Sequence, residues 1–132
     1  MKISYLPLVF CFLAFVVGCG GQPGVRGKIV FSDDKAPLTR GVVNFVNEGR
    51  IARGQIESDG TYVIGSVKAN DGLPPGTYQV YLTSTEKTES SDGGFKREYV
   101  IDRKYDNAET SGITVEVTKS MTFNIELDRY KP

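Results

Sequence analysis

Apolar and polar residues alternate along most of the chain from Val25 onward. In the stretch VRGKIVF, Val25, Ile29 and Phe31 fall on one face, and Arg26 and Lys28 fall on the other. A period of two is that of a β-strand with one buried face. The residues predicted to point inward are Val25, Ile29, Phe31, Val43, Phe45, Tyr62, Ile64, Tyr78, Val80, Leu82, Ile113, Val115, Val117, Met121, Phe123, Ile125 and Leu127. The pattern predicts an all-β fold, a single antiparallel β-sandwich of about seven strands.

Turn residues separate these predicted strands. Ser58-Asp59-Gly60 lies between two of them, and an Asp-Gly pair favours a tight turn because glycine adopts positive φ without steric cost. We therefore expect the strands on either side to form a hairpin. A second hairpin is expected across Lys119 and Ser120, between the strands at 113–117 and 121–127.

The alternation fails between Ser84 and Gly112. This segment is polar and charged, with acidic residues in its first half and basic residues in its second. Long segments without a core pattern in a small domain are usually functional or loosely ordered. We expect an excursion from the sandwich with one edge strand near Glu98 to Ile101, and no helix anywhere in the chain.

The first residues follow a different rule. Ile3 to Val17 carry no charged side chain, and only Met1 and Lys2 precede them. This run is short for a membrane span of about 20 residues and has the charged start and apolar centre of a secretory signal peptide.

The end of that run, Val16-Val17-Gly18-Cys19, resembles the lipobox of bacterial lipoproteins. The resemblance implies that signal peptidase removes residues 1–18 and that Cys19 carries the lipid. Residues 19–24 then form a flexible Gly-rich tether, and residues 25–132 form the domain. Acyl chains anchor a protein because each buried methylene contributes about 0.8 kcal/mol. We expect the protein to be attached to a membrane of the bacterial cell envelope, in the periplasm or facing outward.

Composition narrows the chemistry that the chain could perform. The formal net charge is +0, without the basic excess of a nucleic-acid-binding protein, and there is no histidine. Imidazole-based acid–base catalysis and imidazole metal ligation are therefore excluded. Cys11 would leave with the signal peptide, and Cys19 would be acylated. We expect no enzymatic activity and no cofactor.

Three motifs occur in an order that resembles a known family. They are PLTRG at Pro37 to Gly41, DGTY at Asp59 to Tyr62, and PGTYQV at Pro75 to Val80, after a first strand of the form V-x-G-x-V. This order is similar to that of carboxypeptidase regulatory-like domains in short bacterial lipoproteins. The resemblance implies a transthyretin-like, or prealbumin-like, sandwich that acts as a structural or accessory module without chemistry of its own.

Candidate contact residues are aromatic or charged. Tyr81, Tyr99 and Tyr105 could stack on sugar rings or contact a partner, and Arg103 belongs to the basic half of the 84–112 segment. Several carboxylates could contribute to a calcium site: Asp33, Asp34, Asp59, Asp71, Glu86, Glu89 and Asp92. The favoured function is a lipid-anchored, non-catalytic structural or protein-interaction module of the envelope. The alternative is a β-sandwich that binds carbohydrate or calcium at the cell surface.

Overall fold

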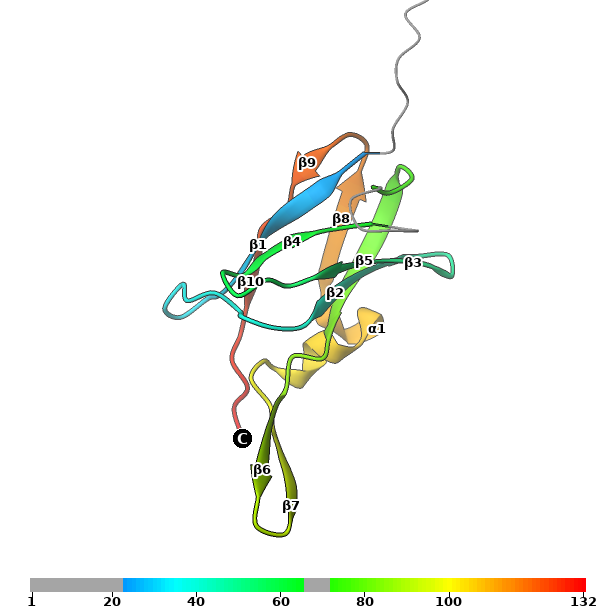
Figure 1. Cartoon of the computed structure of the whole chain (residues 1–132). Coiled ribbons are helices and arrows are strands. Elements are labelled where there is room, and N and C mark those ends of the chain that lie inside the picture. The colour runs from blue at the N-terminus through cyan, green and yellow to red at the C-terminus, as the bar shows by residue number, and fades with distance from the viewer. Residues whose placement is uncertain (1–22, 66–71) are drawn as a thin grey trace, which may run out of the picture.

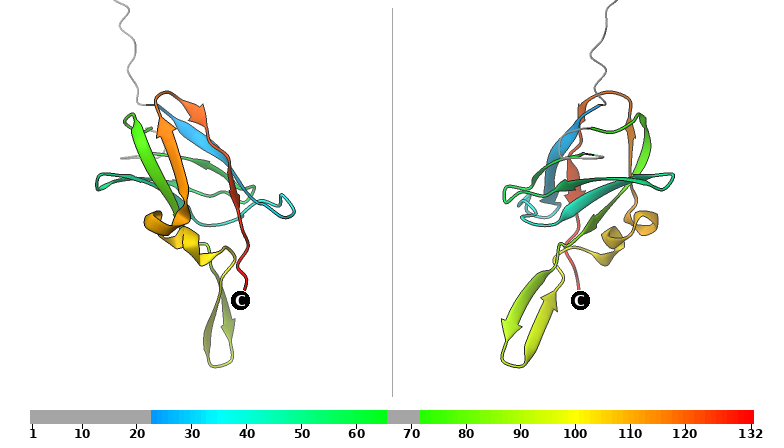
Figure 2. Two further views of the ribbon diagram at one scale, coloured as in Figure 1. Left: turned by 180° about the vertical axis from the view of Figure 1, so that it is seen from behind. Right: turned by 45° about the vertical axis from the view of Figure 1, so that its right-hand side comes forward.

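The computed structural model describes residues 23–65 and 72–132, in which two four-stranded β-sheets pack face to face and a two-stranded sheet projects from them (Figures 1 and 2). One sheet has the order β10-β1-β4, with β9 also paired to β1, and the other has the order β3-β2-β5-β8. The all-β sandwich predicted from the sequence is confirmed. The strands are β1 (Val25–Phe31), β2 (Val42–Asn47), β3 (Arg50–Gln55), β4 (Thr61–Val63), β5 (Gly76–Thr83), β6 (Lys87–Ser91), β7 (Gly94–Glu98), β8 (Ile113–Val117), β9 (Met121–Thr122) and β10 (Ile125–Leu127).

The closing hairpin predicted across Lys119 and Ser120 is wrong. β8 pairs antiparallel with β5 in one sheet, whereas β9 and β10 pair parallel with β1 in the other. The chain therefore crosses between the sheets after Val117, which lets both segments turn apolar faces into the same core. Gly27 permits the approach, because a Cβ there would lie 1.9 Å from the carbonyl oxygen of Phe123.

β9 and β10 are two pieces of one interrupted strand. Between them the Phe123 N–H donates to the Arg26 carbonyl at 2.8 Å, so the contact with β1 continues. At the next residue a side chain takes the place of a backbone carbonyl as acceptor: Asn124 Oδ1 accepts from the Lys28 N–H at 3.0 Å. With this pair taken as one strand, the two sheets hold the seven strands that the sequence predicted.

The predicted turn at Asp59-Gly60 is present, but its two arms do not form a hairpin. Gly60 has a φ of +85°, and a Cβ there would lie 2.7 Å from the Ile29 carbonyl oxygen. β3 pairs with β2 and β4 pairs with β1, so the turn carries the chain from one sheet to the other. Within residues 23–65 and 72–132, one antiparallel bridge, between Arg53 and Gly65, remains of the expected pairing.

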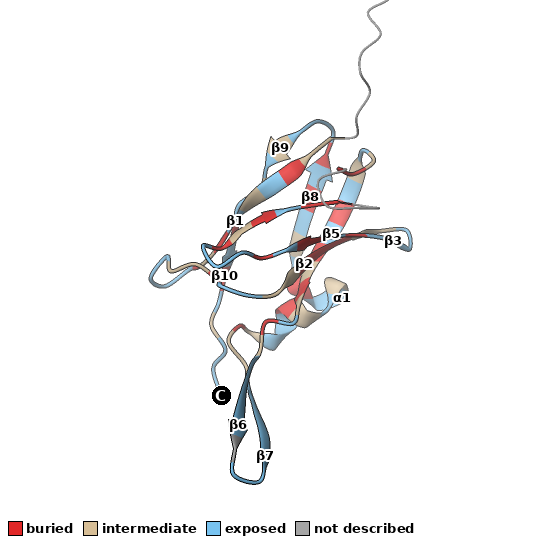
Figure 3. Cartoon of the chain, in the orientation of Figure 1, coloured by how far each residue is buried: buried red, intermediate tan, exposed pale blue. Residues whose placement is uncertain are grey.

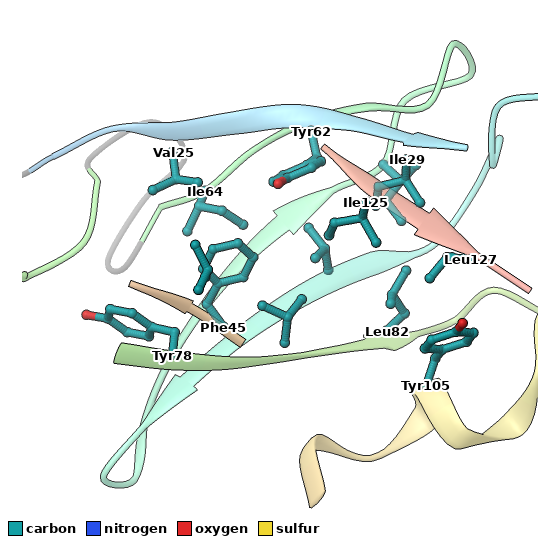
Figure 4. Close-up of a cluster of buried hydrophobic side chains, with 14 of the residues drawn as sticks. Val25, Ile29, Phe45, Tyr62, Ile64, Tyr78, Leu82, Tyr105, Ile125 and Leu127 are labelled. Atoms are coloured by element: carbon teal, nitrogen blue, oxygen red, sulfur yellow. The ribbon is translucent and has the colours of Figure 1, made fainter. Parts of the chain in front are cut away.

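The core lies between the sheets, and most of its side chains come from positions predicted to face inward (Figures 3 and 4). The buried residues that were not predicted are Leu38, Ala52, Ile56, Leu73, Ile101 and Tyr105. Phe45 is 0% exposed at its centre. Its ring centroid lies 6.3 Å from Tyr62, 6.2 Å from Tyr78 and 6.3 Å from Phe123, within the range of favourable aromatic pairs. Met121, Phe123 and Ile113 are only partly buried and pack against its margin.

The segment from Ser84 to Gly112 differs most from its prediction. Instead of one edge strand near Glu98 to Ile101, β6 and β7 form an antiparallel hairpin that projects from the sandwich (Figure 1). Two short helices follow, η1 (Arg103–Asp106) and α1 (Ala108–Ser111), where no helix was expected. The side chains of Asp102 and Asn107 cap them by accepting from the backbone N–H of Lys104 and Glu109.

Membrane attachment depends on residues that the structure does not describe. The predicted signal peptide, Cys19 and most of the tether lie outside the described residues, as does Asp71. Within the described part of the chain, no helix has the length and apolar character needed to cross a bilayer. The lipid anchor stays a prediction from the sequence.

Candidate functional site

The projecting hairpin is fixed to the sandwich by the C-terminal segment. The Asp102 N–H donates to the Asp128 carbonyl at 3.0 Å, and the Tyr130 N–H donates to the Val100 carbonyl at 3.1 Å. Ile101 and Arg129 form an antiparallel bridge between these bonds, and Ile101 is buried in the core. The base of the hairpin is therefore held by a short piece of sheet outside the two main layers.

Asp128 accepts hydrogen bonds from several segments at the base of the hairpin. Its carboxylate accepts from Lys104 Nζ at 3.0 Å, from Ser32 Oγ at 3.0 Å and from the Tyr105 hydroxyl at 3.3 Å. The Lys104 hydrogen bond, followed by that of Ser32, lowers the pKa of Asp128, and the same bond to Asp128 raises the pKa of Lys104. Tyr105 is 5% exposed, so its ring is part of the core margin and not a stacking platform.

We expect Asp128→Asn to weaken the domain in a pH-dependent way. The folded-state pKa of Asp128 lies below the ordinary value of 3.8, so the ionised carboxylate stabilises the fold above that pH. This contribution disappears as the pH falls through the lowered pKa. Urea unfolding of both proteins should therefore show a difference at pH 7 that closes in acid. An equal difference at both pH values would mean that the charge of Asp128 is not what stabilises the base.

Two of the calcium candidates have another role. Asp33 and Asp34 hold the Arg129 guanidinium at 3.0 and 2.9 Å, and that guanidinium lies 3.8 Å above the Phe31 ring. The backbone N–H of Ala36 is the main cause that lowers the pKa of Asp34.

Asp59 instead closes its own turn, where the hydroxyl and backbone N–H of Thr61 donate to it and lower its pKa. Across residues 23–65 and 72–132, no three acidic, cysteine or histidine side chains gather in a metal-binding arrangement.

A groove of about 630 Å³ lies between the hairpin and the C-terminal residues. At its base the Tyr99 and Tyr130 rings are 5.3 Å apart, and the Arg103 guanidinium lies 4.5 Å from the centre of the Tyr99 ring. Two of the predicted contact residues, Tyr99 and Arg103, are thus brought together. The groove is lined by Glu89, Lys96, Arg97, Glu98, Tyr99, Tyr130 and Pro132.

The hairpin itself is exposed on both faces (Figure 3). Lys87 faces Glu98 and Glu89 faces Lys96 across the two strands, so opposite charges are paired on one face. On the other face, near the tip, Phe95 is 83% exposed, the highest value among the exposed large hydrophobic residues of the described chain. An aromatic side chain held in water on a projecting hairpin is available to a partner.

Tyr81 does not belong to this site. It lies on β5 opposite Asn44, on the outer face of the β3-β2-β5-β8 sheet, and is half-buried. Asn44 is buried there and its polar atoms are paired: Arg53 Nε donates to its Oδ1 at 3.1 Å, and its amide donates to the Tyr81 carbonyl and to Thr83 Oγ1. The outer face at Tyr81 is thus part of a satisfied polar network.

Sequence reasoning missed Phe95 and Tyr130. Phe95 follows the Asp92-Gly93-Gly94 run, a turn signal that could have indicated a hairpin. Tyr130 has no comparable signal, because its place beside Tyr99 results from pairing between segments that are distant in the sequence.

No protein-family model matches the chain, and neither does any curated protein. Among solved structures, it is similar to BcpA, the major pilin subunit of Bacillus cereus, with a TM-score of 0.50 and 17% identity over 82% of this chain and 30% of that one.

A DUF3823 family protein from Bacteroides ovatus is also similar, with a TM-score of 0.48 and 14% identity over 83% of this chain and 45% of that one. The chain therefore spans less than half the length of either protein. At these identities the likeness to the pilin subunit shows a shared β-sandwich fold and leaves function to be argued from this chain's own residues.

Proposed function

We propose that this protein is a lipid-anchored, non-catalytic interaction module of the bacterial cell envelope, and that the β6–β7 hairpin is its contact surface. The observation that carries the proposal is the position of that hairpin. The described chain begins at one end of the sandwich, and the hairpin projects from the opposite end (Figures 1 and 2). A lipid on Cys19 would thus leave the hairpin on the end that points away from the membrane.

The hairpin has the properties of a contact element rather than of a core element. Its described side chains are all exposed, with Phe95 at 83%. Aromatic side chains contribute strongly when a partner buries them. The anchored base keeps the hairpin in one orientation, which lowers the conformational entropy lost on binding.

A non-catalytic role agrees with the chemistry of the chain. There is no histidine in the sequence, and the acidic groups at Asp33, Asp34, Asp59 and Asp128 are engaged in ion pairs or turns. The fold shared with a major pilin subunit is compatible with a structural module.

The test compares two single substitutions of exposed apolar residues. Phe95→Ser changes the hairpin, whereas Ile51→Ser changes β3, where Ile51 is 37% exposed. After chemical cross-linking in intact envelopes, we expect Phe95→Ser to lose the adducts formed by the unaltered protein and Ile51→Ser to keep them. Loss of adducts in both variants, or in neither, would argue against the hairpin as the contact surface.

The groove beside Tyr99 and Tyr130 supports a second candidate function, binding of a carbohydrate. Two tyrosine rings 5.3 Å apart can offer apolar faces to sugar rings, and Arg103 and Arg97 supply donors nearby. Calorimetry against envelope polysaccharides tests it. Heat that is lost in Tyr99→Ala and Tyr130→Ala but kept in Tyr81→Ala would favour this function, and no heat with the unaltered protein would exclude it for the polysaccharides used.

A further inference from the structure

The outer edge of β6 is open. β6 pairs with β7 and, within the described part of the chain, with no other strand. The body of the domain reaches this edge at Glu86, whose carbonyl accepts from Arg40 Nη1 at 3.2 Å. From Lys87 to Ser90 the residues of β6 are exposed. An unpaired strand edge is a template for another strand.

The hydrogen-bond pattern of the hairpin shows which backbone groups of β6 are not used in pairing with β7. A two-residue turn, Asp92-Gly93, is closed by the pair Ser91 and Gly94. In such hairpins the closing pair exchanges backbone hydrogen bonds, and every second pair after it does the same. The N–H and C=O groups of Glu89 and Lys87 therefore point to β7. Those of Thr88 and Ser90 point to the open edge.

The charged side chains of β6 are complementary to those of a second, antiparallel copy of β6. The order Lys87-Thr88-Glu89 places a positive and a negative charge symmetrically about Thr88. If a second copy of β6 lies antiparallel with Thr88 opposite Thr88, each Lys87 faces the Glu89 of the other copy. The central pair also uses the outward-pointing backbone groups, so backbone and side chains favour the same register.

The charges of β7 extend this complementarity across four strands. Within one hairpin, Glu98 faces Lys87 and Lys96 faces Glu89. Across two paired hairpins, one row of side chains then reads Glu98, Lys87, Glu89 and Lys96, with the last two from the second copy. The signs alternate along the row, and the symmetric row has the same alternation. Opposite charges on facing strands stabilise a sheet, and like charges destabilise it.

Other arrangements lose this match. Pairing centred on Glu89 places Glu89 opposite itself, and a parallel arrangement in register places Lys87 opposite Lys87. Pairing centred on Ser90 places Glu89 opposite Ser91 and leaves both Lys87 and Glu89 without an opposite charge. The antiparallel register about Thr88 is therefore the one that the charge pattern selects.

We propose that the partner of the β6 edge is a second copy of this chain, paired antiparallel about Thr88 into a four-stranded ribbon. This inference rests on the proposed function in one respect, since it takes the hairpin as a contact surface. Antiparallel pairing sends the two sandwiches to opposite ends of the ribbon. The ends at which the described chains begin then lie farthest apart, because each sandwich has its hairpin opposite that end (Figure 1). The pairing therefore joins chains whose Cys19 anchors lie in facing membrane surfaces, and not chains side by side in one surface.

Disulfide trapping in the full-length chain tests the register. With Thr88→Cys the two new thiols face each other, and mild oxidation of the detergent-solubilised protein, in which two copies can meet in any orientation, should give a covalent dimer. Ser90→Cys is the matched control, because Ser90 faces Glu86 in the proposed register and lies about 13 Å from its own copy. The unaltered chain, oxidised in the same way, measures any disulfide dimer that forms through Cys19. Trapping of Ser90→Cys but not of Thr88→Cys would overturn the proposal, as would trapping of neither.

A charge exchange in the Thr88→Cys background tests the chemistry. Glu89→Lys alone sets two positive charges against each other wherever the copies meet, and Lys87→Glu alone sets two negative charges there. The yield of trapped dimer should therefore fall at least about fivefold in each variant. Coproduced with each other, the two variants should form a mixed dimer, because position 87 of one chain faces position 89 of the other and both contacts then join opposite charges.

The double exchange Lys87→Glu with Glu89→Lys in one chain supplies the rescue. It restores opposite charges at both contacts between two copies of that chain but sets like charges against Glu98 and Lys96 within each hairpin, so its dimer should return part of the way to the original level. Lys96→Glu, which alters the facing pair within one hairpin, should reduce trapping less than Glu89→Lys does.

The outcomes separate this inference from the proposed function. Absence of trapping at Thr88, together with Phe95-dependent adducts to other proteins, would contradict the second copy as partner and leave the hairpin as the contact surface. Trapping at Thr88 without rescue by the exchanged charges would contradict the charge-selected register.

Discussion

Replacing Cys19 with serine is expected to abolish processing and membrane attachment. The serine hydroxyl cannot form the thioether to lipid that the resemblance to a lipobox implies, and the lipoprotein signal peptidase would then have no substrate. The variant should accumulate with residues 1–18 still attached. Intact mass of the protein purified from envelopes measures this directly, because the unaltered mature chain should begin at Cys19 and carry acyl mass.

Cys11→Ser is the matched control for that experiment. Cys11 lies inside the apolar run that would be removed, so its substitution should leave both the mature mass and the membrane fraction unchanged. Recovery of an unaltered protein that begins beyond Cys19 and carries no acyl group would contradict the lipid anchor.

The second large effect is expected from Phe45→Ala. Phe45 is 0% exposed and contacts the rings of Tyr62, Tyr78 and Phe123, which come from both sheets. Truncation leaves a cavity at the centre of the sandwich, with a cost of about 3–5 kcal/mol in the free energy of unfolding. Since a domain of this size is stable by about 5–15 kcal/mol, a large share of the total would be lost.

Urea unfolding followed by tyrosine fluorescence and circular dichroism measures this difference. Phe95→Ala serves as the control, because it makes the same chemical change at a side chain that is 83% exposed and should alter the free energy of unfolding by no more than about 0.5 kcal/mol. Similar stability of the two variants would contradict the assignment of Phe45 to the core.

The inward faces of the strands could be predicted because burial imposes a local pattern. In β1 and β5, alternate side chains contact the core, so Val25, Ile29, Tyr78 and Val80 are recognisable in a window of a few residues. The turn at Gly60 is equally local, since it depends on one residue with positive φ.

Sheet membership could not be predicted in the same way. Whether the strand after Lys119 pairs with β8 or crosses to β1 depends on which open edge lies within reach, and both choices bury the same apolar face. The β6–β7 hairpin was missed for the opposite reason. Its faces are both exposed, so no apolar alternation is needed to form it.

The candidate site was predicted in part. The 84–112 segment was recognised as an excursion, and Tyr99 and Arg103 lie together at its base. Tyr105 was assigned to the surface, but its ring is buried and its hydroxyl bonds to Asp128, a contact between residues 23 positions apart. Single-sequence reasoning identifies such residue types but does not show which distant segment covers them.

The most direct test of the account is photo-cross-linking from position 95 in intact envelopes. A photoreactive phenylalanine analogue at that position retains an exposed aromatic ring, and the same analogue at Glu116 on β8 labels an exposed site outside the hairpin. The account predicts discrete adducts from position 95, membrane-associated through Cys19, and none from position 116. Adducts from position 116 alone, or equal labelling from both, would contradict a lipid-anchored module that makes its contacts through the hairpin.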